Sequence, residues 1–484
     1  MFDSNINHYT CQVLKYPYFW YDAPMNIELT NTLSKKKEVF VPIHAGTVGM
    51  YHCGPTVYHF VHIGNLRAFV LADITRRVFE YNNYQVNQVM NITDIGHLVS
   101  DGDDGDDKMT KGLKREGMEV TLENMLTLAR KYEAVFLSDI ASINILKPKI
   151  IARASDHIAE DIEIIKKLEA KNYTYTTSDG VYFATEHMHD YGALGGIMQT
   201  AADHSRLGEH SEKKNPRDFA LWKFDTSKGW PSPWGQGFPG WHIECSGMSM
   251  KYLGEQFDIH TGGHDLASVH HNNEIAQSEC STGHAPFVNY WLHNEFVNIG
   301  ETKMAKSGDN FITLETVREH GIDPLALRYL YLQAHYRSQV SFSWEALEGA
   351  ETALHRLGKI VAGFPDGGTI SESYQVLFHE EINDDLNTAG GLAVVWELLK
   401  NPEVSNEDKK ATILDFDRVL GLDLDKASAE AVIEIPALVG KLLEDRLEAR
   451  TAKDWQKSDE LRDHIKTLGF LVKDTDEGQQ VSKL

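Results

Sequence analysis

The feature that most constrains the fold is a strand, a loop, a helix and a second strand between residues 48 and 92. The first strand is expected at Val48–Cys53, where a Gly-Pro pair ends it. A helix opening at residues 62–65 carries apolar residues at spacing four on one face: Val70, Ile74 and Val78. Gln85–Ile92 predicts the next strand. Such a unit is typical of a doubly wound α/β domain with a parallel sheet.

Later regions depart from this α/β pattern. Alternating tyrosines and an Asp-Gly turn predict a hairpin over 173–183, and Ser155 is expected to cap the helix before it. We interpret about 150–225 as an insertion in the α/β domain, because residues 186–240 show few clear periods. From about residue 313 the chain is expected to be helical nearly to its end, with Gly469 ending the last helix.

Composition narrows the class of protein. The 484 residues, 42% hydrophobic and 24% charged, are ordinary for a globular chain of about three domains. No run approaches the about 18 apolar residues of a transmembrane helix. The first residues also lack the basic start and apolar run of a signal peptide, so we expect a cytoplasmic protein without membrane contact. The formal net charge of −24 argues against a general nucleic-acid binder, although a local basic groove stays compatible with it.

Two short motifs could bind phosphates, and neither is decisive alone. His62-Ile63-Gly64-Asn65 puts a glycine at a helix N-terminus, where a phosphate can approach free N–H groups. A capped helix with a surface histidine is the alternative. Lys303 and Lys306 lie in a loop of small residues and could stabilise a polyphosphate, or they could form a solvated basic turn.

A third motif, His270-His271-Asn272-Asn273-Glu274, could bind a metal. If it is helical, His270 and Glu274 project from one face one turn apart. Cys53 and Cys245 could complete a tetrahedral zinc site, although two buried cysteines and an exposed polar helix would show the same spacing. The four cysteines of the chain contain no C-x-x-C pair and form no disulfide framework.

Taken in their order along the chain, these pieces resemble a known family. The segments CGPTVYHFVHIGN, GWHIECS, HHNNEIAQSE, KMAKS and AKDWQKSDELRDHIKTLG are similar to those of class I cysteinyl-tRNA synthetases, over about residues 25–484. The resemblance implies an α/β fold: a Rossmann-type catalytic core with a connecting insertion, followed by an all-helical C-terminal domain. It also implies two reaction steps. ATP activates cysteine to cysteinyl adenylate with release of pyrophosphate, and the terminal ribose hydroxyl of tRNA(Cys) then takes the cysteinyl group.

The resemblance implies one zinc ion per chain, with the ligands Cys53, Cys245, His270 and Glu274. The zinc is expected to bind the thiolate of the substrate cysteine. Serine differs from cysteine by one atom, and a pocket based on shape would reject it poorly. A soft thiolate binds zinc far better than a hydroxyl does, so the metal would read the sulfur directly. ATP would enter as a substrate together with Mg²⁺.

The resemblance assigns the other site residues by position. The catalytic signatures would be His62, Asn65, Lys303 and Lys306. The ATP site would contain His59, His62, Gly64, Asn65, Gly263, Asp265 and Lys306. The cysteine pocket would contain Gly54, Thr93 and Trp241. Two positions depart from the family pattern: Asn65 stands where His is more common, and Ala305 replaces a serine. Asn keeps a hydrogen-bond donor and both lysines remain, so we expect activity to survive.

We expect the chain to divide into an N-terminal extension, two catalytic halves around the insertion, a stem-contact region and an anticodon-binding domain: 1–24, 25–150, 151–225, 226–312, 313–350 and 351–484. The composition changes at Met25, so we hypothesise that the extension is dispensable. Two other readings stay open: a cysteine ligase with an amino-sugar acceptor, and a non-catalytic zinc- and RNA-binding paralogue. About 130 residues follow the catalytic motifs, which favours tRNA as the partner. We expect a monomer.

Overall fold

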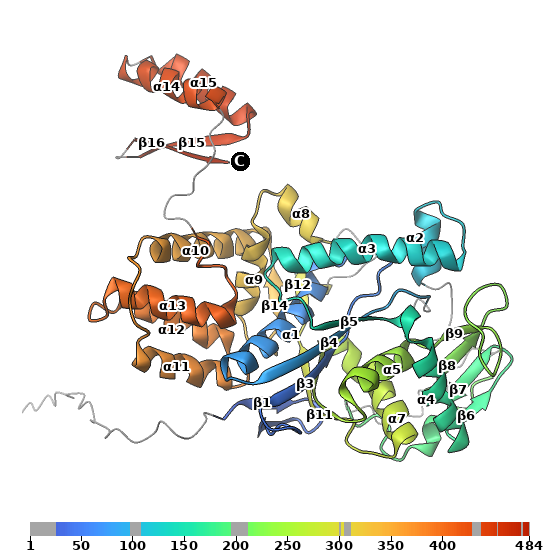
Figure 1. The fold of residues 1–484 in the computed structure, drawn as a ribbon. Coiled ribbons are helices and arrows are strands. Elements are labelled where there is room, and N and C mark those ends of the chain that lie inside the picture. The colour runs from blue at the N-terminus through green and yellow to red at the C-terminus, as the bar shows by residue number, and fades with distance from the viewer. Residues whose placement is uncertain are drawn as a thin grey trace, which may run out of the picture.

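The computed structural model describes residues 26–96, 108–194, 212–299, 302–303, 311–427, 437–452, 454–475 and 478–483. Its core is a parallel sheet of five strands in the order β11-β10-β3-β4-β5 (Figure 1). These strands are Val288–Asn294, Phe257–Gly263, Thr47–His52, Gln85–Ile92 and Ile150–Arg153. The chain order reverses between β10 and β3, and ligands of open α/β sheets bind in the crevice at such a point.

The predicted strand–helix–strand unit is confirmed. After β3, helix α1 spans Ile63–Tyr81, and His62 caps its N-terminus by accepting a hydrogen bond from the Asn65 backbone N–H. The apolar residues at spacing four, Val70, Ile74 and Val78, are buried as expected. Four further helices belong to this half of the molecule: α2 (Lys108–Arg115), α3 (Leu122–Ser142), α5 (Trp241–Leu253) and α7 (Asn272–Thr282).

The region between β5 and α5 forms a small separate layer. It contains α4 (Ile158–Ala170) and an antiparallel sheet in the order β6-β7-β8-β9. Its strands are Thr174–Thr176, Gly180–Phe183, Phe219–Phe224 and Gly237–Pro239. The hairpin expected over 173–183 is present. The sheet continues to Pro239, beyond the expected end of the insertion at residue 225, and the domain boundaries themselves stay a prediction.

The prediction that Ser155 caps α4 is wrong. The helix begins two residues later, after His157. Ser155 instead bonds to Asp94, which follows the neighbouring strand β4. Its backbone N–H and its hydroxyl donate to the Asp94 carboxylate at 2.9 and 2.6 Å. A tertiary partner has therefore replaced the local cap.

Short strands and helices complete the region around the sheet. A hairpin of β1 (Glu28–Asn31) and β2 (Lys36–Val39) lies beside β11, and α6 (His264–Leu266) follows β10. A three-stranded sheet joins β12 (Val297–Ile299) to β13 (Thr302–Lys303) and β14 (Val340–Phe342). The expected helical region follows: α8 (Leu314–Glu319), α9 (Pro324–Leu332), α10 (Trp344–Ala362), α11 (Glu372–Asn383), α12 (Thr388–Lys400) and α13 (Asn406–Leu420).

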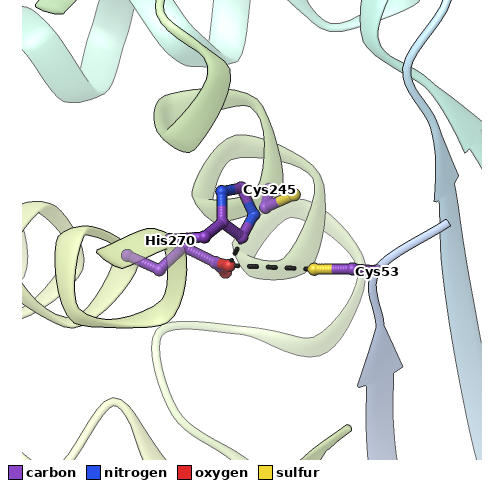
Figure 2. Close-up of side chains that lie close together, drawn as sticks. Cys53, Cys245 and His270 are labelled. Atoms are coloured by element: carbon purple, nitrogen blue, oxygen red, sulfur yellow. Dashed lines mark hydrogen bonds and ion pairs between the residues drawn. The ribbon is translucent and has the colours of Figure 1, made fainter. Parts of the chain in front are cut away.

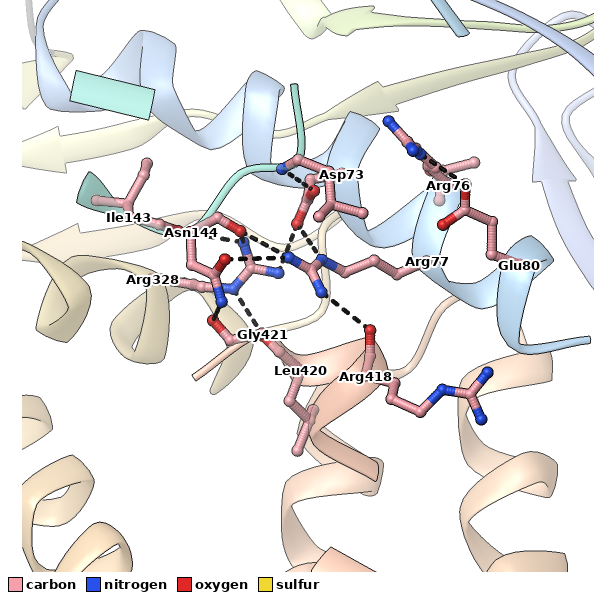
Figure 3. Close-up of polar contacts among 12 residues, drawn as sticks. Asp73, Arg76, Arg77, Glu80, Ile143, Asn144, Arg328, Arg418, Leu420 and Gly421 are labelled. Carbon is pink, nitrogen blue, oxygen red and sulfur yellow. Dashed lines mark hydrogen bonds and ion pairs between the residues drawn. The ribbon is translucent and has the colours of Figure 1, made fainter. Parts of the chain in front are cut away.

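A buried group of charges joins α1 to this helical region, and we call Asp73, Arg77 and Arg328 the arginine joint (Figure 3). The Asp73 carboxylate accepts from Arg77 Nε at 2.8 Å and from Arg328 Nη2 at 2.6 Å. Arg328 Nε also donates to the Leu420 carbonyl and Arg77 Nη1 to the Arg418 carbonyl, at 2.6 and 3.0 Å. The last carbonyls of α13 thus find charged donors on α1 and α9.

The last described part of the chain has a small core of its own. Helices α14 (Ala437–Thr451) and α15 (Trp455–Thr467) pack around Val439, Leu442, Ile465 and Phe470. The predicted helix end at Gly469 is confirmed, and this glycine has the left-handed φ of +86°. The expectation of an all-helical C-terminal domain missed the hairpin β15–β16 (Phe470–Thr475 and Gly478–Lys483). No helix among the described residues is long and apolar enough to cross a membrane.

Candidate active site

A cavity of about 250 Å³ opens where the sheet order reverses, at the carboxyl ends of β3 and β10. Its wall comes from the loop after β3, the first turn of α1, the start of α5 and the end of β10. Apart from the metal ligands treated below, seven of the residues assigned by the resemblance line it: Gly54, His62, Gly64, Asn65, Trp241, Gly263 and Asp265. This is the position at which doubly wound folds bind nucleotides.

The N-terminus of α1 borders this cavity. Gly64 and Asn65, in the first turn, line it together with His62. His62 Nδ1 accepts from the Asn65 N–H at 3.2 Å, so the cap fixes the imidazole ring at the helix end. The partial positive charge of the helix N-terminus favours an anion in the cavity.

The turn after β3 is held by a residue that the sequence did not single out. Gly54 donates its backbone N–H to Asn91 Oδ1 at 2.7 Å, and Asn91 lines the cavity from β4. A Cβ added to Gly54 would lie 1.6 Å from the Asn91 carbonyl oxygen, so only glycine fits this approach of two strands. An asparagine near the end of an apolar strand gives no local signal of such a contact.

The expected metal ligands converge on the floor of the cavity, and we call Cys53, Cys245, His270 and Glu274 the ligand cluster (Figure 2). Their four donor atoms all lie within 4.8 Å of one another. Three residues are buried and Cys53 is half-buried, and Cys53, Cys245 and His270 line the cavity. Two thiols, one imidazole and one carboxylate are donors that zinc accepts, so the residues fit this metal.

Local structure explains how His270 and Glu274 meet. A π-helical turn, Ala267–His271, leads into α7, and His270 Nε2 lies 3.0 Å from Glu274 Oε1. His242, at the start of α5, meets the other ring nitrogen of His270 with 2.8 Å between the two Nδ1 atoms. This second contact orients the imidazole toward the cluster, as outer hydrogen bonds of metal ligands do.

The charges of the cluster stabilise one another. A hydrogen bond from Cys53, which outweighs burial, lowers the pKa of Cys245 to about 6. Burial alone would lower the pKa of His270, but the Cys245 thiolate and Glu274 raise it to about 10. Burial would also raise the pKa of Glu274, and His260 and His270 lower it instead to about 2. The arrangement therefore favours the thiolate of Cys245 and the carboxylate of Glu274 at neutral pH, which are the states that bind metals, and it holds on His270 a proton that a bound metal would displace.

A second group of donors lies directly behind the first. Cys53, His260, His271 and Glu274 also have their donor atoms within 4.8 Å of one another. His260 and His271 are fully buried and do not line the cavity, and His260 stacks on Trp291 with 4.6 Å between the ring centroids. Of the two groups, only the first has members besides Cys53 that line the cavity.

Two further side chains stand over the cluster. The ring of Trp241 lies 4.3 Å from that of His270, between centroids, and lines the cavity as expected for a cysteine pocket. Lys108, at the start of α2, places its Nζ 4.7 Å from the Trp241 ring centroid and also lines the cavity. Nothing in the sequence singles out Lys108, because it follows a run of aspartates and glycines at 101–107 and belongs to no motif.

Besides Glu274, two of the described assigned residues lie outside the cavity wall. Thr93 is buried, and its backbone pairs with that of Pro55 and Val57, so it holds the loop after β3 from behind. His59 contacts the rings of Tyr132 and Phe311. Lys306 and Ala305 fall outside the described residues, and of Lys303 only the backbone, in β13, is described.

Comparisons with known proteins agree with the geometry. A family model described as the tRNA synthetases class I (C) catalytic domain matches residues 39–352, a DALR domain matches 377–424, and a cysteinyl-tRNA ligase anticodon binding domain matches 434–481. Cysteine–tRNA ligase 1 of Burkholderia lata is 46% identical over 463 residues, covering 94% of this chain and 97% of the relative. Cysteine–tRNA ligase of Treponema denticola is 41% identical over 488 residues, covering 93% and 98%.

A solved structure supports the fold at much lower identity. Methionyl-tRNA synthetase of Mycobacterium tuberculosis, in complex with methionyl-adenylate, superposes with a TM-score of 0.52 at 14% identity, over 78% of this chain and 90% of that one. The expected core and helical region are therefore those of a class I synthetase. Since the relatives match nearly end to end and the catalytic family model covers more than half of the chain, this protein belongs to the cysteine–tRNA ligase family.

Proposed function

We propose that this chain activates cysteine with ATP and transfers it to tRNA(Cys), and that a zinc ion bound by the ligand cluster selects the substrate. The observation that carries the proposal is the position of the cluster. Four metal-binding donors meet within 4.8 Å at the floor of the cavity that the N-terminus of α1 borders. Amino-acid selection and phosphate binding can thus occur in one space.

The chain's own residues divide the work of the first step. The positive end of the α1 dipole and the ring of His62 are suited to hold the phosphates of ATP, with Mg²⁺ as counterion. Trp241 closes the space beside His270 and limits the size of the amino acid. Bound zinc would supply a soft Lewis acid that prefers the sulfur of cysteine to the oxygen of serine. Lys303 and Lys306 stay proposed partners of the pyrophosphate.

The C-terminal region supports tRNA as the acceptor. The anticodon-binding and DALR matches cover the helical part of the chain, which an enzyme acting on an amino sugar would not need. We further propose a monomer that works in the cytoplasm. Transfer to tRNA should weaken strongly as salt rises, because the contacts are to phosphates.

The test is cysteine-dependent exchange of pyrophosphate into ATP, run beside serine, followed by charging of tRNA(Cys). Exchange with cysteine and almost none with serine, together with one zinc per chain, is expected. Exchange without tRNA charging would direct the search to another acceptor. Comparable exchange with serine would contradict selection by the metal, and no exchange from folded, zinc-loaded protein would favour the non-catalytic paralogue.

A further inference from the structure

One aspartate of the helical region makes an unusual number of contacts with the catalytic core. Asp385 lies between α11 and α12 and is 2% exposed. Its Oδ1 accepts from the Thr30 N–H and the Tyr336 hydroxyl, both at 2.7 Å. Its Oδ2 accepts from the Thr30 hydroxyl at 2.7 Å and from Arg337 Nε at 2.8 Å.

The backbone around Asp385 is held in a conformation that costs free energy. Asp385 and Leu386 are consecutive non-glycine residues with φ of +57° and +58°. Such residues persist only where the surrounding contacts hold them in place. Here the Asp385 N–H donates to the Glu28 carbonyl at 2.9 Å, and the His335 ring meets the Asp385 carbonyl at 2.9 Å. Both backbone groups are therefore tied to the core.

The strand that Asp385 holds leads to the ligand cluster. Two residues after Thr30, the Thr32 hydroxyl lies 2.9 Å from His293 Nδ1. His293 Nε2 lies 2.7 Å from His271 Nδ1, and His271 Nε2 lies 3.5 Å from Cys53 Sγ. A continuous chain of hydrogen bonds thus runs from β1 to a metal ligand, and His271 and His293 are both buried.

The hydrogen bonds along this chain can all run in only one of two donor-to-acceptor directions. Each neutral imidazole has one donor and one acceptor nitrogen. In the direction in which Cys53 Sγ accepts, His271 Nε2 carries the proton, His293 Nε2–H donates to His271, and the Thr32 hydroxyl donates to His293. In that direction His271 Nε2 offers Cys53 an N–H. It then has no lone pair there for a metal, so His271 could not serve as a ligand in the second donor group.

We infer that Asp385 is a positioning residue for the amino-acid site. By fixing Thr30 it keeps the Thr32 hydroxyl on His293 and so directs the His271 N–H at Cys53. The inference rests on the proposed function, because it concerns how the same cluster meets cysteine. It gives the helical region a role in the first reaction step, before tRNA is needed.

The matched pair Asp385→Asn and Asp415→Asn tests this inference. Asp415 is likewise a buried carboxylate of the helical region that accepts from a core residue, the Tyr81 hydroxyl of α1, but that contact lies away from β1. Asn has one acceptor oxygen where Asp has two, so each variant loses part of its contacts. Outer contacts of metal ligands typically change affinity or activity about 10–100-fold. We expect Asp385→Asn to raise the KM for cysteine in exchange about tenfold with kcat within about twofold. Asp415→Asn should lower Tm and leave this KM unchanged.

A second variant interrupts the hydrogen-bond chain at Thr32, and its smaller change in the side chain guards against misfolding. Thr32→Val removes only the hydroxyl, and Thr32→Ser keeps it. Thr32→Val should show the same rise in KM and release zinc to a chromophoric chelator about tenfold faster, and Thr32→Ser should restore both. The double variant Asp385→Asn/Thr32→Val should be little worse than either single one, because residues that act through one chain are not additive.

The outcomes separate this inference from the proposed function. An unchanged KM and zinc-release rate in Thr32→Val would overturn the inference while leaving the proposed function intact. Equal rises in KM for Asp385→Asn and Asp415→Asn would overturn it as well, since general loosening would then suffice. Failure of the unmodified enzyme to exchange with cysteine would overturn the proposed function itself.

Discussion

The ligand cluster and the arginine joint are both buried groups of polar side chains, yet they are built in opposite ways. In the joint, positive and negative groups face each other, and the arginine donors end on carbonyls of Leu420 and Arg418. In the cluster, four electron-pair donors converge within 4.8 Å beside a cavity. Converging donors repel unless protons or a cation lie among them. The comparison teaches that a buried group whose donors and acceptors are paired with one another has a structural role. A buried group of converging electron-pair donors instead indicates a site for a ligand.

Replacing a cluster cysteine should have the largest effect on function. Cys245→Ser puts a hard oxygen in place of a soft ligand, so we expect cysteine-dependent exchange to fall by more than the about 10–100-fold seen for outer contacts. Zinc content should fall with it in the purified protein. Cys280→Ser is the matched control, since Cys280 is a buried cysteine of α7 outside the cluster. Equal activity in both variants would contradict a ligand role for the cluster, and with it the contrast between the cluster and the joint.

Breaking the joint should affect stability and spare the chemistry. Arg328→Met leaves Asp73 short of one buried partner, and such a loss typically costs about 3–5 kcal/mol of unfolding free energy. Arg76→Met, one residue before Arg77, removes a partly exposed pair with Glu80 and should cost below about 1 kcal/mol. Urea unfolding followed by circular dichroism measures both. Below its unfolding transition, Arg328→Met should keep the KM for cysteine. A changed KM would contradict a purely structural role for the joint.

The two regions should also respond to acid in different pH windows. The pKa of Cys245 is lowered to about 6 by Cys53, so its thiolate is lost as the pH falls through 6. Burial raises the pKa of Asp73, but Arg328 and Arg77 lower it overall, so the joint contributes above the unfolded value of about 3.9 and fails only below it. Zinc affinity should therefore decline near pH 6, while the urea midpoint holds until below about pH 4. A parallel decline of both quantities would contradict this.

The smallest effect is expected on the cavity wall. Asn65→His restores the residue more common in the family at the first turn of α1, close to His62. Because Asn already offers a donor, exchange should change by less than about tenfold, with zinc content unchanged. A larger rise in exchange activity would mean that the charge of a histidine contributes to phosphate binding. A loss of zinc would show that a residue of the cavity wall affects the ligand cluster on its floor.

Local signals predicted some parts of the molecule well. The spacing of Val70, Ile74 and Val78 marks the buried face of α1, and β4 coincides with the predicted Gln85–Ile92. The ligand cluster needed the family resemblance, because its members lie up to 221 residues apart and spacing alone admits other readings. Their convergence in the structure agrees with the assignment, and the individual site roles stay proposals.

Other contacts had no signature in the sequence. The hydrogen bond from Thr30 to Asp385 joins residues 355 positions apart, and no local pattern around either residue predicts it. Lys108 and Asn91 reach the cavity only through the way α2 and β4 pack around it. Ser155 has the residue type of a helix cap, but the Asp94 carboxylate competes for it successfully. Tertiary partners decide such cases, and a local pattern does not contain them.

The π-helical turn Ala267–His271 has a consequence for how this segment can evolve. It inserts one residue more than an α-helix would hold, and two adjacent histidines thereby serve different neighbours, His270 the ligand cluster and His271 the chain from Thr32. Deleting one residue here would rotate the preceding part of the helix by about 100° relative to α7. Point substitutions can therefore accumulate in this turn, whereas a change of its length would exchange the two histidines, so we expect gaps to be excluded from it in any descendant that retains the activity.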